Sequence, residues 1–324
     1  MIDHCAFNGD ADGLCALQQL RLAGELDEAV RLVSGVKRDI ALLQRVQAGP
    51  GERVTVLDIA HEQNRADVAR LLGAGARVRY FDHHFAGELP VHPAFESFID
   101  TAADVCTSLL VDRYLEGRFH RWAVAAAFGD GMAGPARALA ARHGLGAEET
   151  RQLEELGLLL NYNAYGDSLA DLHFEPLALA AELLPYADPL DFVRHSPNFA
   201  RLREGYAADM AAAAALEPWR AGEGALLYKL PEATWARRVS GVLANQLAAR
   251  DPQRALGLLS ARADGDWTFS LRVPANASLE ADAFCRGFAT GGGRKRAAGI
   301  NRLPAGTLEQ FAGQLLDSYP HPAP

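Results

Sequence analysis

Three apolar segments near the start of the chain are each closed by carboxylate or imidazole side chains, and this pattern constrains the fold more than any other feature. The polar residues are Asn8-Gly9-Asp10-Ala11-Asp12-Gly13 after the first segment, Asp58 near the end of RVTVLDI (53–59), and Asp82-His83-His84 directly after RVRYF (77–81). In an open parallel sheet, ligands are bound at the carboxyl ends of the strands. We therefore expect the three polar groups to meet at one rim of such a sheet.

The alternation of strands and helices around these segments indicates an α/β fold. We expect strands over 4–8, 28–33, 53–59, 77–81 and 96–99, and helices over 12–23 and from residue 60 to near residue 72. Strand, helix, strand at this spacing implies parallel pairing with right-handed crossovers. The fold class is thus an N-terminal parallel-sheet domain, to which the rest of the chain adds helices and a second unit.

Residues 104–210 have a predominantly helical pattern, which is strongest over 153–160, 176–184 and 199–216. The alanine run 211–215 suits a connecting helix, with a low-complexity spacer as the alternative. A second unit has expected strands at 224–230, 254–259 and 267–273 and expected helices at 239–250, 281–288 and 307–319. We expect a catalytic domain over 1–196, a linker helix over 197–221 and a smaller α/β domain over 222–324.

Composition excludes several classes of protein. A chain of 324 residues with 49% hydrophobic and 23% charged residues is typical of globular proteins with two domains. No apolar run reaches about 18 residues, and the N-terminus lacks a basic lead-in, so we expect neither a membrane span nor a signal peptide. The 4 cysteines form no CxxC pair, which fits a reducing cytoplasm. A net charge of -9 argues against coating of long duplex DNA but allows a small anionic substrate.

The carboxylates expected at the rim indicate a metal site. Any one of them is explained as a turn former or a helix cap. Together they would repel one another unless a cation neutralised them. Oxygen ligands mixed with imidazole suit Mn²⁺, with Mg²⁺ or Zn²⁺ as alternatives.

A glycine-rich, basic segment near the C-terminus suits an anion. In GGGRKRAAG (291–299), consecutive glycines let backbone N–H groups approach a ligand closely, and three cationic side chains follow. The alternative is a plain glycine loop beside a solvated basic run. It is not a P-loop, because the GxxxxGK spacing and the following Ser or Thr are missing.

These segments resemble the motifs of the DHH phosphoesterase family, which includes RecJ-type exonucleases, nanoRNA and pAp phosphatases and cyclic-dinucleotide phosphodiesterases. NGDADG, the LD of RVTVLDI and FDHH match its first three motifs, and Asp130 in AFGDG (127–131) matches the fourth. Ser270-Leu271-Arg272, Asp282 and GGGRKRAAG resemble the DHH-associated substrate-binding domain. The order of the motifs matches across nearly the whole chain.

The resemblance implies a role for each matching residue. Two metal ions, about 3.5–4 Å apart, would activate a water for attack on phosphorus. The implied metal-site residues are Asn8, Asp10, Asp12, Asp58, His83 and Asp130, with Asp58 bridging the ions. The residues implied in catalysis are Asp58, Asp82, which orients an imidazole, and His84, which contacts the scissile phosphate. The implied substrate-binding residues are Ser270, Arg272, Gly291, Gly292, Gly293, Arg294, Lys295 and Arg296.

Three positions depart from the family pattern. Many members have His where this chain has Ala6, and RecJ-type members have Asp where it has Asn8, a neutral and weaker ligand. Arg294 stands where the family usually has His. Arginine binds phosphate through two parallel hydrogen bonds, but unlike histidine it does not lose its charge near neutral pH. The departures bear mainly on the first metal and on the choice of substrate.

The resemblance and the small acidic chain together favour a two-metal phosphodiesterase acting on short single-stranded oligonucleotides or on cyclic or linear dinucleotides. A nucleotide phosphomonoesterase of the pAp type and a catalytically weak nucleotide-binding module stay open as alternatives. A dehydrogenase is disfavoured because no strand–GxGxxG–helix unit occurs near the N-terminus. The oligomeric state stays open, with a homodimer as one alternative, and no membrane partner is expected.

Overall fold

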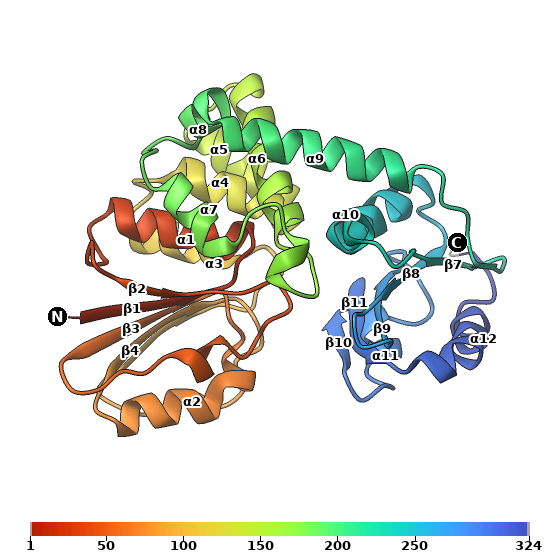
Figure 1. Ribbon diagram of the computed structural model, residues 1–324, viewed down its shortest axis with the longest axis horizontal. Helices are drawn as coiled ribbons and strands as arrows, with labels where there is room; N and C mark the ends of the chain where they lie inside the picture. The colour runs from red at the N-terminus through yellow and green to blue at the C-terminus, as the bar shows by residue number, and fades with distance from the viewer. Residues whose placement is uncertain (1, 323–324) are drawn as a thin grey trace. The chain divides into compact units, whose positions relative to one another are not determined.

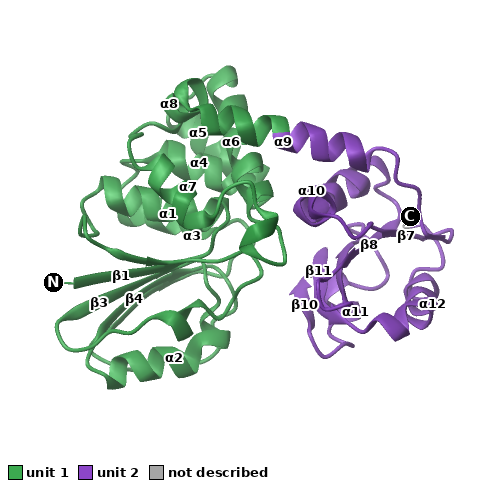
Figure 2. Cartoon of the chain, viewed as in Figure 1, with its two compact units in different colours: residues 1–204 green, residues 205–324 purple. Residues whose placement is uncertain are grey.

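The computed structural model describes residues 2–322 and divides into two compact units, Met1–Glu204 and Gly205–Pro324 (Figure 2). Their boundary falls inside helix α9 (Pro197–Ala213). That helix is the one expected over 199–216, and it ends at Ala213 instead of Leu216. The division into domains at 1–196 and 222–324 with a linker over 197–221 stays a prediction.

Unit 1 combines a parallel sheet with a set of helices (Figure 1). Its strands are β1 (Ile2–Phe7), β2 (Arg31–Val33), β3 (Glu52–Leu57), β4 (Arg77–Asp82) and β5 (Phe95–Ile99). Its helices, besides the first part of α9, are α1 (Ala11–Leu22), α2 (His61–Gly73), α3 (Thr107–Tyr114), α4 (His120–Gly129), α5 (Ala133–Arg142), α6 (Ala147–Asn163), α7 (Pro176–Leu183) and α8 (Pro189–His195), with short 3-10 turns at Leu42–Arg45 and Leu169–Asp171.

The sheet of unit 1 has the order β2-β1-β3-β4-β5, and every pairing in it is parallel, which confirms the predicted fold class. The central strands are largely buried because both faces of the sheet are covered; Val56 and Phe81, for example, have no exposed surface. The edge strand β5 exposes Glu96 and Ser97, as an edge in contact with water requires.

The predicted helical stretch after residue 104 is confirmed. It forms α3 to α9, and Trp122 of α4 is fully buried within unit 1. Helices α4 and α6 pack closely where two glycines meet, since a Cβ on Gly157 would lie 2.8 Å from the backbone nitrogen of Gly129. This contact sets the position of the C-terminus of α4, and Asp130 follows there directly.

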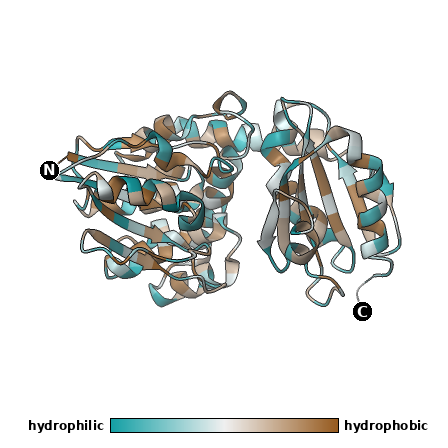
Figure 3. Ribbon diagram, turned by 90° about the horizontal axis from the view of Figure 1, so that it is seen from below, coloured by the Kyte–Doolittle hydropathy of each residue, from teal (hydrophilic) through white to brown (hydrophobic). Residues whose placement is uncertain are grey.

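Unit 2 is a mixed sheet with three helices besides the end of α9. Its elements are β6 (Arg220–Ala221), β7 (Ala225–Lys229), α10 (Thr234–Arg250), β8 (Ala255–Ala261), β9 (Trp267–Arg272), α11 (Ala281–Cys285), β10 (Gly291–Arg294), β11 (Ala297–Leu303), a 3-10 turn (Ala305–Thr307) and α12 (Leu308–Ser318). The sheet order is β10-β11-β9-β8-β7-β6. One face of this sheet packs on α11 and α12 through a core that includes Phe269, Phe284 and Phe311. Figure 3 shows hydrophobic colour along the strands of the sheet.

The bounds of two helices expected in unit 2 need correction. The helix expected from residue 239 begins at Thr234, and the one expected to reach residue 288 ends at Cys285. The glycine-rich segment, for which a plain loop was the alternative to an anion-binding element, begins with the edge strand β10, which pairs antiparallel with β11. Glycine has low strand propensity, so this hairpin depends on pairing with β11 and not on local preference.

All four cysteines are free thiols with buried side chains. Within residues 2–322, every helix is too short or too polar to cross a membrane.

Candidate metal centre

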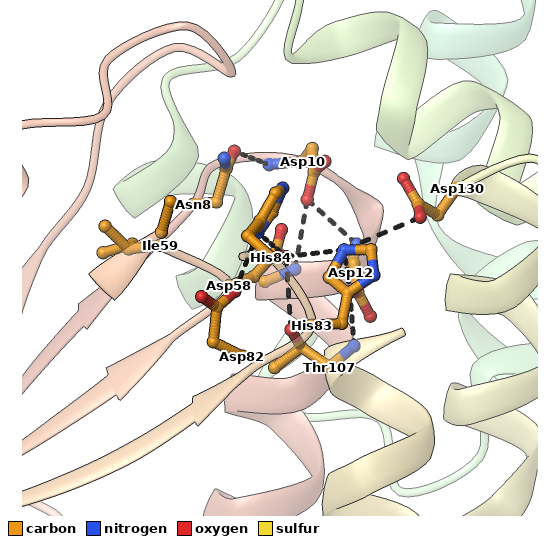
Figure 4. A network of polar contacts seen from close by, with 12 residues as sticks. Asn8, Asp10, Asp12, Asp58, Ile59, Asp82, His83, His84, Thr107 and Asp130 are labelled. Carbon is orange, nitrogen blue, oxygen red and sulfur yellow. Dashed lines mark hydrogen bonds and ion pairs between the residues drawn. The ribbon is translucent and has the colours of Figure 1, made fainter. Parts of the chain in front are cut away.

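The candidate site lies at the carboxyl edge of the sheet, where the strand order reverses between β1 and β3. Such a reversal leaves a crevice above the strand ends, which is the usual ligand site of open α/β sheets. Backbone bonds continue the strand ladder beyond the strands: Asn8 N–H donates to Leu57 (3.1 Å), and Asp58 N–H donates to Phe81 (3.0 Å). The polar segments after β1, β3 and β4 are thereby held side by side (Figure 4).

The imidazole of His83 is the centre of the site. Its Nε2 atom lies 3.4 Å from Oδ1 of Asp58, 3.9 Å from Oδ2 of Asp12 and 3.8 Å from Oδ2 of Asp130. Asp58 directly follows β3, Asp12 belongs to α1 and Asp130 follows α4, so the site is assembled by long-range folding. Asp58, His83 and His84 also offer ligand atoms that all lie within 4.8 Å of one another.

The other nitrogen of His83 fixes the orientation of the ring. Nδ1 lies 2.9 Å from the carbonyl oxygen of Val105, to which the Nδ1–H group donates. In the neutral ring this tautomer leaves the lone pair on Nε2, the atom that faces the carboxylates. The side chain is therefore oriented as a metal ligand would be.

Asp58 is held in an unusual conformation for a residue other than glycine. Its φ angle is 58°, in the left-handed region, and its side chain is buried. Such backbone strain persists only where surrounding contacts determine it, and it is common at functional sites. Here the contacts are the Asp58 N–H bond to β4 and a 3.2 Å hydrogen bond from the Thr107 hydroxyl to Oδ1 of Asp58.

Asp12 belongs to α1 but also binds the N-terminus of α3. Its Oδ2 and Oδ1 atoms accept hydrogen bonds of 2.7 Å from the backbone N–H groups of Thr107 and Ser108. The first N–H groups of a helix have no partner within the helix, so a carboxylate is favourable there. Asp12 thus ties the helical part of unit 1 to the rim of the sheet.

Asp10 caps α1 and contacts a lysine. Its Oδ1 atom accepts from the backbone N–H groups of Asp12 (3.0 Å) and Gly13 (3.1 Å), and its Oδ2 atom is paired with the ammonium of Lys37. The same ammonium lies 3.0 Å from Oδ1 of Asn161 and 3.9 Å from Oδ1 of Asp130. Burial raises the pKa of Asp10, but the charge of Lys37 and the hydrogen bonds that Asp10 accepts together outweigh this effect, and the pKa is lowered overall.

His84 is oriented by Asp82. Nδ1 of His84 lies 2.7 Å from Oδ1 of Asp82, whose side chain is fully buried, while that of His84 is 45% exposed. The second oxygen of Asp82 is buried and has no hydrogen-bond partner among residues 2–322. Burial lowers the pKa of His84, but the adjacent Asp82 carboxylate outweighs this effect and raises it.

The charges of the site are strongly coupled. Burial, followed by the nearby carboxylates of Asp10 and Asp12, raises the pKa of Asp58 well above its usual value. Burial would lower the pKa of His83, yet the surrounding carboxylates, led by Asp58, raise it to about 10. Negative charge is therefore crowded here, which is the condition that favours a bound cation.

The donor set fits a divalent cation around His83. Carboxylate oxygens of Asp12, Asp58 and Asp130 together with an imidazole nitrogen suit Mn²⁺ or Mg²⁺. The position that the resemblance assigns to Asn8 and Asp10 fits poorly. The Asn8 amide donates to the Lys37 carbonyl (3.3 Å) and accepts from the Asp10 N–H (3.3 Å), so both of its ends bind backbone.

In unit 2, four of the eight residues expected to bind substrate share one face of the sheet. Cross-strand neighbours lie on the same face, and the register aligns Arg272 with Ala297 and Arg294, and Ser270 with Gly299 and Gly292. We call this set the arginine row. Ala297 lies between the two arginines, and Gly299 lies between Ser270 and Gly292.

The other four expected residues lie elsewhere. Gly291 and Gly293 align with Ile300 and Ala298, whose side chains enter the core on the opposite face. Lys295 and Arg296 form the turn between β10 and β11, and Lys295 is paired with Glu280 (3.0 Å).

Sequence reasoning missed several residues that contact the site, among them Lys37, Thr107 and Asn161. Lys37 follows β2, so the strand-end argument applied to β2 would have found it. Thr107 and Asn161 gave no comparable signal, because they reach the site only through helix packing.

Similarity to solved structures supports the fold. No protein-family model matches the sequence, and no curated protein is significantly similar to it. The structure resembles exonuclease RecJ bound to manganese (TM-score 0.63, 17% identity, 97% of this chain and 88% of that chain). It also resembles PggH, a pGpG-specific phosphodiesterase from Vibrio cholerae (TM-score 0.59, 14% identity, 98% of both chains).

A further similar structure is RecJ from Thermus thermophilus in complex with Mn²⁺ (TM-score 0.56, 18% identity, 99% of this chain and 53% of that chain). The chain thus has a DHH/RecJ-like fold, as the motifs in its sequence implied.

Proposed function

We propose that this protein is a metal-dependent phosphodiesterase that hydrolyses short oligonucleotides or dinucleotides, linear or cyclic. The observation that carries the proposal is the convergence of Asp12, Asp58 and Asp130 on Nε2 of His83. The similarity to an exonuclease and to a pGpG-specific phosphodiesterase supports a phosphodiester substrate.

Mn²⁺ is the cation we propose, with Mg²⁺ as the alternative. The mixed oxygen and nitrogen donors support it, and two of the similar structures are manganese-bound. When bound, the cation supplies Lewis-acid activation of the phosphoryl group and of the attacking water. Asp12, Asp58, His83 and Asp130 would hold it.

We assign His84 to the scissile phosphate. Its Nδ1 atom is engaged by Asp82, which leaves Nε2 as the nitrogen available to a substrate. An imidazolium held by a buried carboxylate donates a charge-assisted hydrogen bond to a phosphoryl oxygen. Asp82 acts on the reaction through His84 and is a positioning residue.

The arginine row of unit 2 is our candidate for binding the non-reacting part of the substrate. Guanidinium groups bind phosphate with two parallel hydrogen bonds. The neighbouring positions on this face carry the small residues Ala297, Gly299 and Gly292. Arg272 is oriented by a 2.7 Å hydrogen bond from its Nε–H group to Oδ1 of Asn245. We expect its removal to weaken substrate binding more than it slows the chemical step.

A substrate panel tests the proposal. Mn²⁺-loaded protein should hydrolyse pGpG, a cyclic dinucleotide or a short single-stranded oligonucleotide, and EDTA should stop the reaction. The Asp58→Asn and His83→Ala variants should lose activity by about 100-fold or more. Hydrolysis of pAp alone would support a phosphomonoesterase, and binding of every nucleotide without turnover would support a binding module.

A further inference from the structure

We propose that Lys37 acts as a built-in second cation, so that the site binds one divalent ion and uses the Lys37 ammonium where a two-metal phosphoesterase uses its other ion. The inference rests on the proposed function for its catalytic meaning, but it concerns how many ions this chain binds. We infer it from the contacts that Lys37 makes with the chain around it, and from those of Asn8, Asp10 and Asp130.

The backbone of Lys37 is anchored on both sides. Its N–H group donates to the carbonyl of Ala164 (2.9 Å), at the C-terminal end of α6, and its own carbonyl accepts from the side chain of Asn8 (3.3 Å). The side chain is 22% exposed, and its Nζ atom lies 5.7 Å from the centre of the Tyr165 ring. The ammonium is thus directed into the site by fixed structure.

The oxygens around the ammonium are those that a metal ion would use. An ammonium has three N–H donors, and Lys37 faces one oxygen each of Asp10, Asn161 and Asp130. A divalent ion bound to Asp10 would lie close to this positive charge and be repelled by it. No replacement ligand is offered by Ala6, and both ends of the Asn8 amide bind backbone.

Asp130 links the ammonium to the proposed metal position. Its Oδ1 atom lies 3.9 Å from Nζ of Lys37, and its Oδ2 atom lies 3.8 Å from Nε2 of His83. In a two-metal site, two cations about 3.5–4 Å apart share carboxylate ligands. Here the two oxygens of one carboxylate face an ammonium and a metal-binding imidazole.

Metal stoichiometry tests the inference without turnover. Full-length protein dialysed against Mn²⁺ should bind one ion per chain and give the six-line paramagnetic resonance spectrum of an isolated Mn²⁺. The Lys37→Met variant frees three oxygens and should bind two ions, with a spin-coupled spectrum. Lys37→Arg keeps the charge and should bind one ion. Lys229→Met, a control at an exposed lysine of unit 2, should match the wild type.

The dependence of hydrolysis on Mn²⁺ gives a second measurement. Wild-type activity should rise with the first power of the Mn²⁺ concentration, and Lys37→Met activity with the second power. At the Mn²⁺ concentration that saturates the wild type, Lys37→Met should be about 100-fold slower, the typical effect of losing one preorganised charge.

The outcomes separate this inference from the proposed function. Two coupled ions in the wild type, or a folded Lys37→Met variant that still binds one ion, would overturn the inference while hydrolysis could stand. One ion per wild-type chain without hydrolysis of any tested substrate would refute the phosphodiesterase proposal alone. A wild type that binds no Mn²⁺ would refute both.

Discussion

Nε2 of His83 lies 3.4 Å from Oδ1 of Asp58, although the two residues follow different strands of the parallel sheet. Each strand end is fixed by backbone hydrogen bonds to its neighbour, so the contact is a consequence of register. If the Asp58 carboxylate and the His83 imidazole lay on different faces of the sheet, one cation could not contact both. Their proximity makes the site open to direct tests.

Mn²⁺ should stabilise the folded protein. The raised pKa of Asp58 reflects crowded negative charge that a cation relieves. A ligand present at 100 times its Kd and bound only by the folded state adds about 2.7 kcal/mol to the free energy of unfolding. Thermal unfolding with Mn²⁺ and with EDTA measures this difference. Asp58→Asn should lose most of the shift, and an equal shift in both proteins would contradict the assignment of Asp58.

Asp82→Asn should slow hydrolysis by about 10- to 100-fold, the usual effect of removing a residue that orients a functional imidazole. The expected signature is a lower kcat at unchanged Mn²⁺ stoichiometry, because Asp82 contacts His84 and not the proposed ligands. Asp112→Asn, another buried carboxylate in α3, is the matched control and should leave kcat unchanged. Loss of bound Mn²⁺ in Asp82→Asn would argue that Asp82 is itself a ligand.

Gly157→Ala should destabilise the protein by about 1–3 kcal/mol, which is the usual effect of adding a group to a well-packed core. The new Cβ would lie 2.8 Å from the backbone nitrogen of Gly129 and would push α4 away from α6. Because Asp130 ends α4, Mn²⁺ affinity should fall as well. Gly134→Ala in α5 is the control: nothing lies within 4 Å of its Cβ, so this variant should be neutral or slightly more stable. Urea unfolding of both variants provides the comparison.

Gly293→Ala should disrupt the β10–β11 hairpin, whereas Gly292→Ala should not. Gly293 has φ of 145°, and its Cβ would lie 2.8 Å from the Ala297 carbonyl; the Cβ of Gly292 meets nothing within 4 Å. If the arginine row binds substrate, Gly292→Ala should raise KM at unchanged stability, because its methyl group would lie on that face. Thermal unfolding and steady-state kinetics separate the two effects, and an unchanged KM in Gly292→Ala would remove this face from the binding site.

Asp3 should stabilise the protein in a pH-dependent way. Burial raises its pKa, but hydrogen bonds from Arg53 (2.8 Å) and from the Asp27 N–H group (2.9 Å) outweigh this effect and lower it. A lowered pKa means that the stabilisation is fully present above the unfolded value of about 3.9 and is lost as the pH falls below it. Asp3→Asn should cost about 1–3 kcal/mol at pH 7 and much less near pH 3. An equal difference at both pH values in urea unfolding would contradict this account.

The strand-end argument predicted much of the site from sequence. Asp10, Asp58 and His83 could be placed together because residues that close adjacent parallel strands share an edge. Asp130 needed the motif as a guide, since nothing in the local pattern of α4 tells a site carboxylate from a helix cap.

Applied to β2, the strand-end argument brings Lys37 to this edge of the sheet, but it predicts neither the contacts of the Lys37 ammonium nor the β10–β11 hairpin. The position of Lys37 depends on anchors at Asn8 and Ala164, and contacts over such sequence separations leave no periodic signal. The segment 291–294 has the composition of a loop, and its strand conformation depends on pairing with β11.

The bonds from Asp12 to the start of α3 affect how mutational data at this position are to be interpreted. An alanine there would withdraw a candidate metal ligand and, at the same time, leave two helix N–H groups without their acceptor. Lost turnover at position 12 would therefore combine a chemical defect with a folding defect. Asp58 and His83, which cap no helix, are the positions at which an inactive variant can be attributed to chemistry.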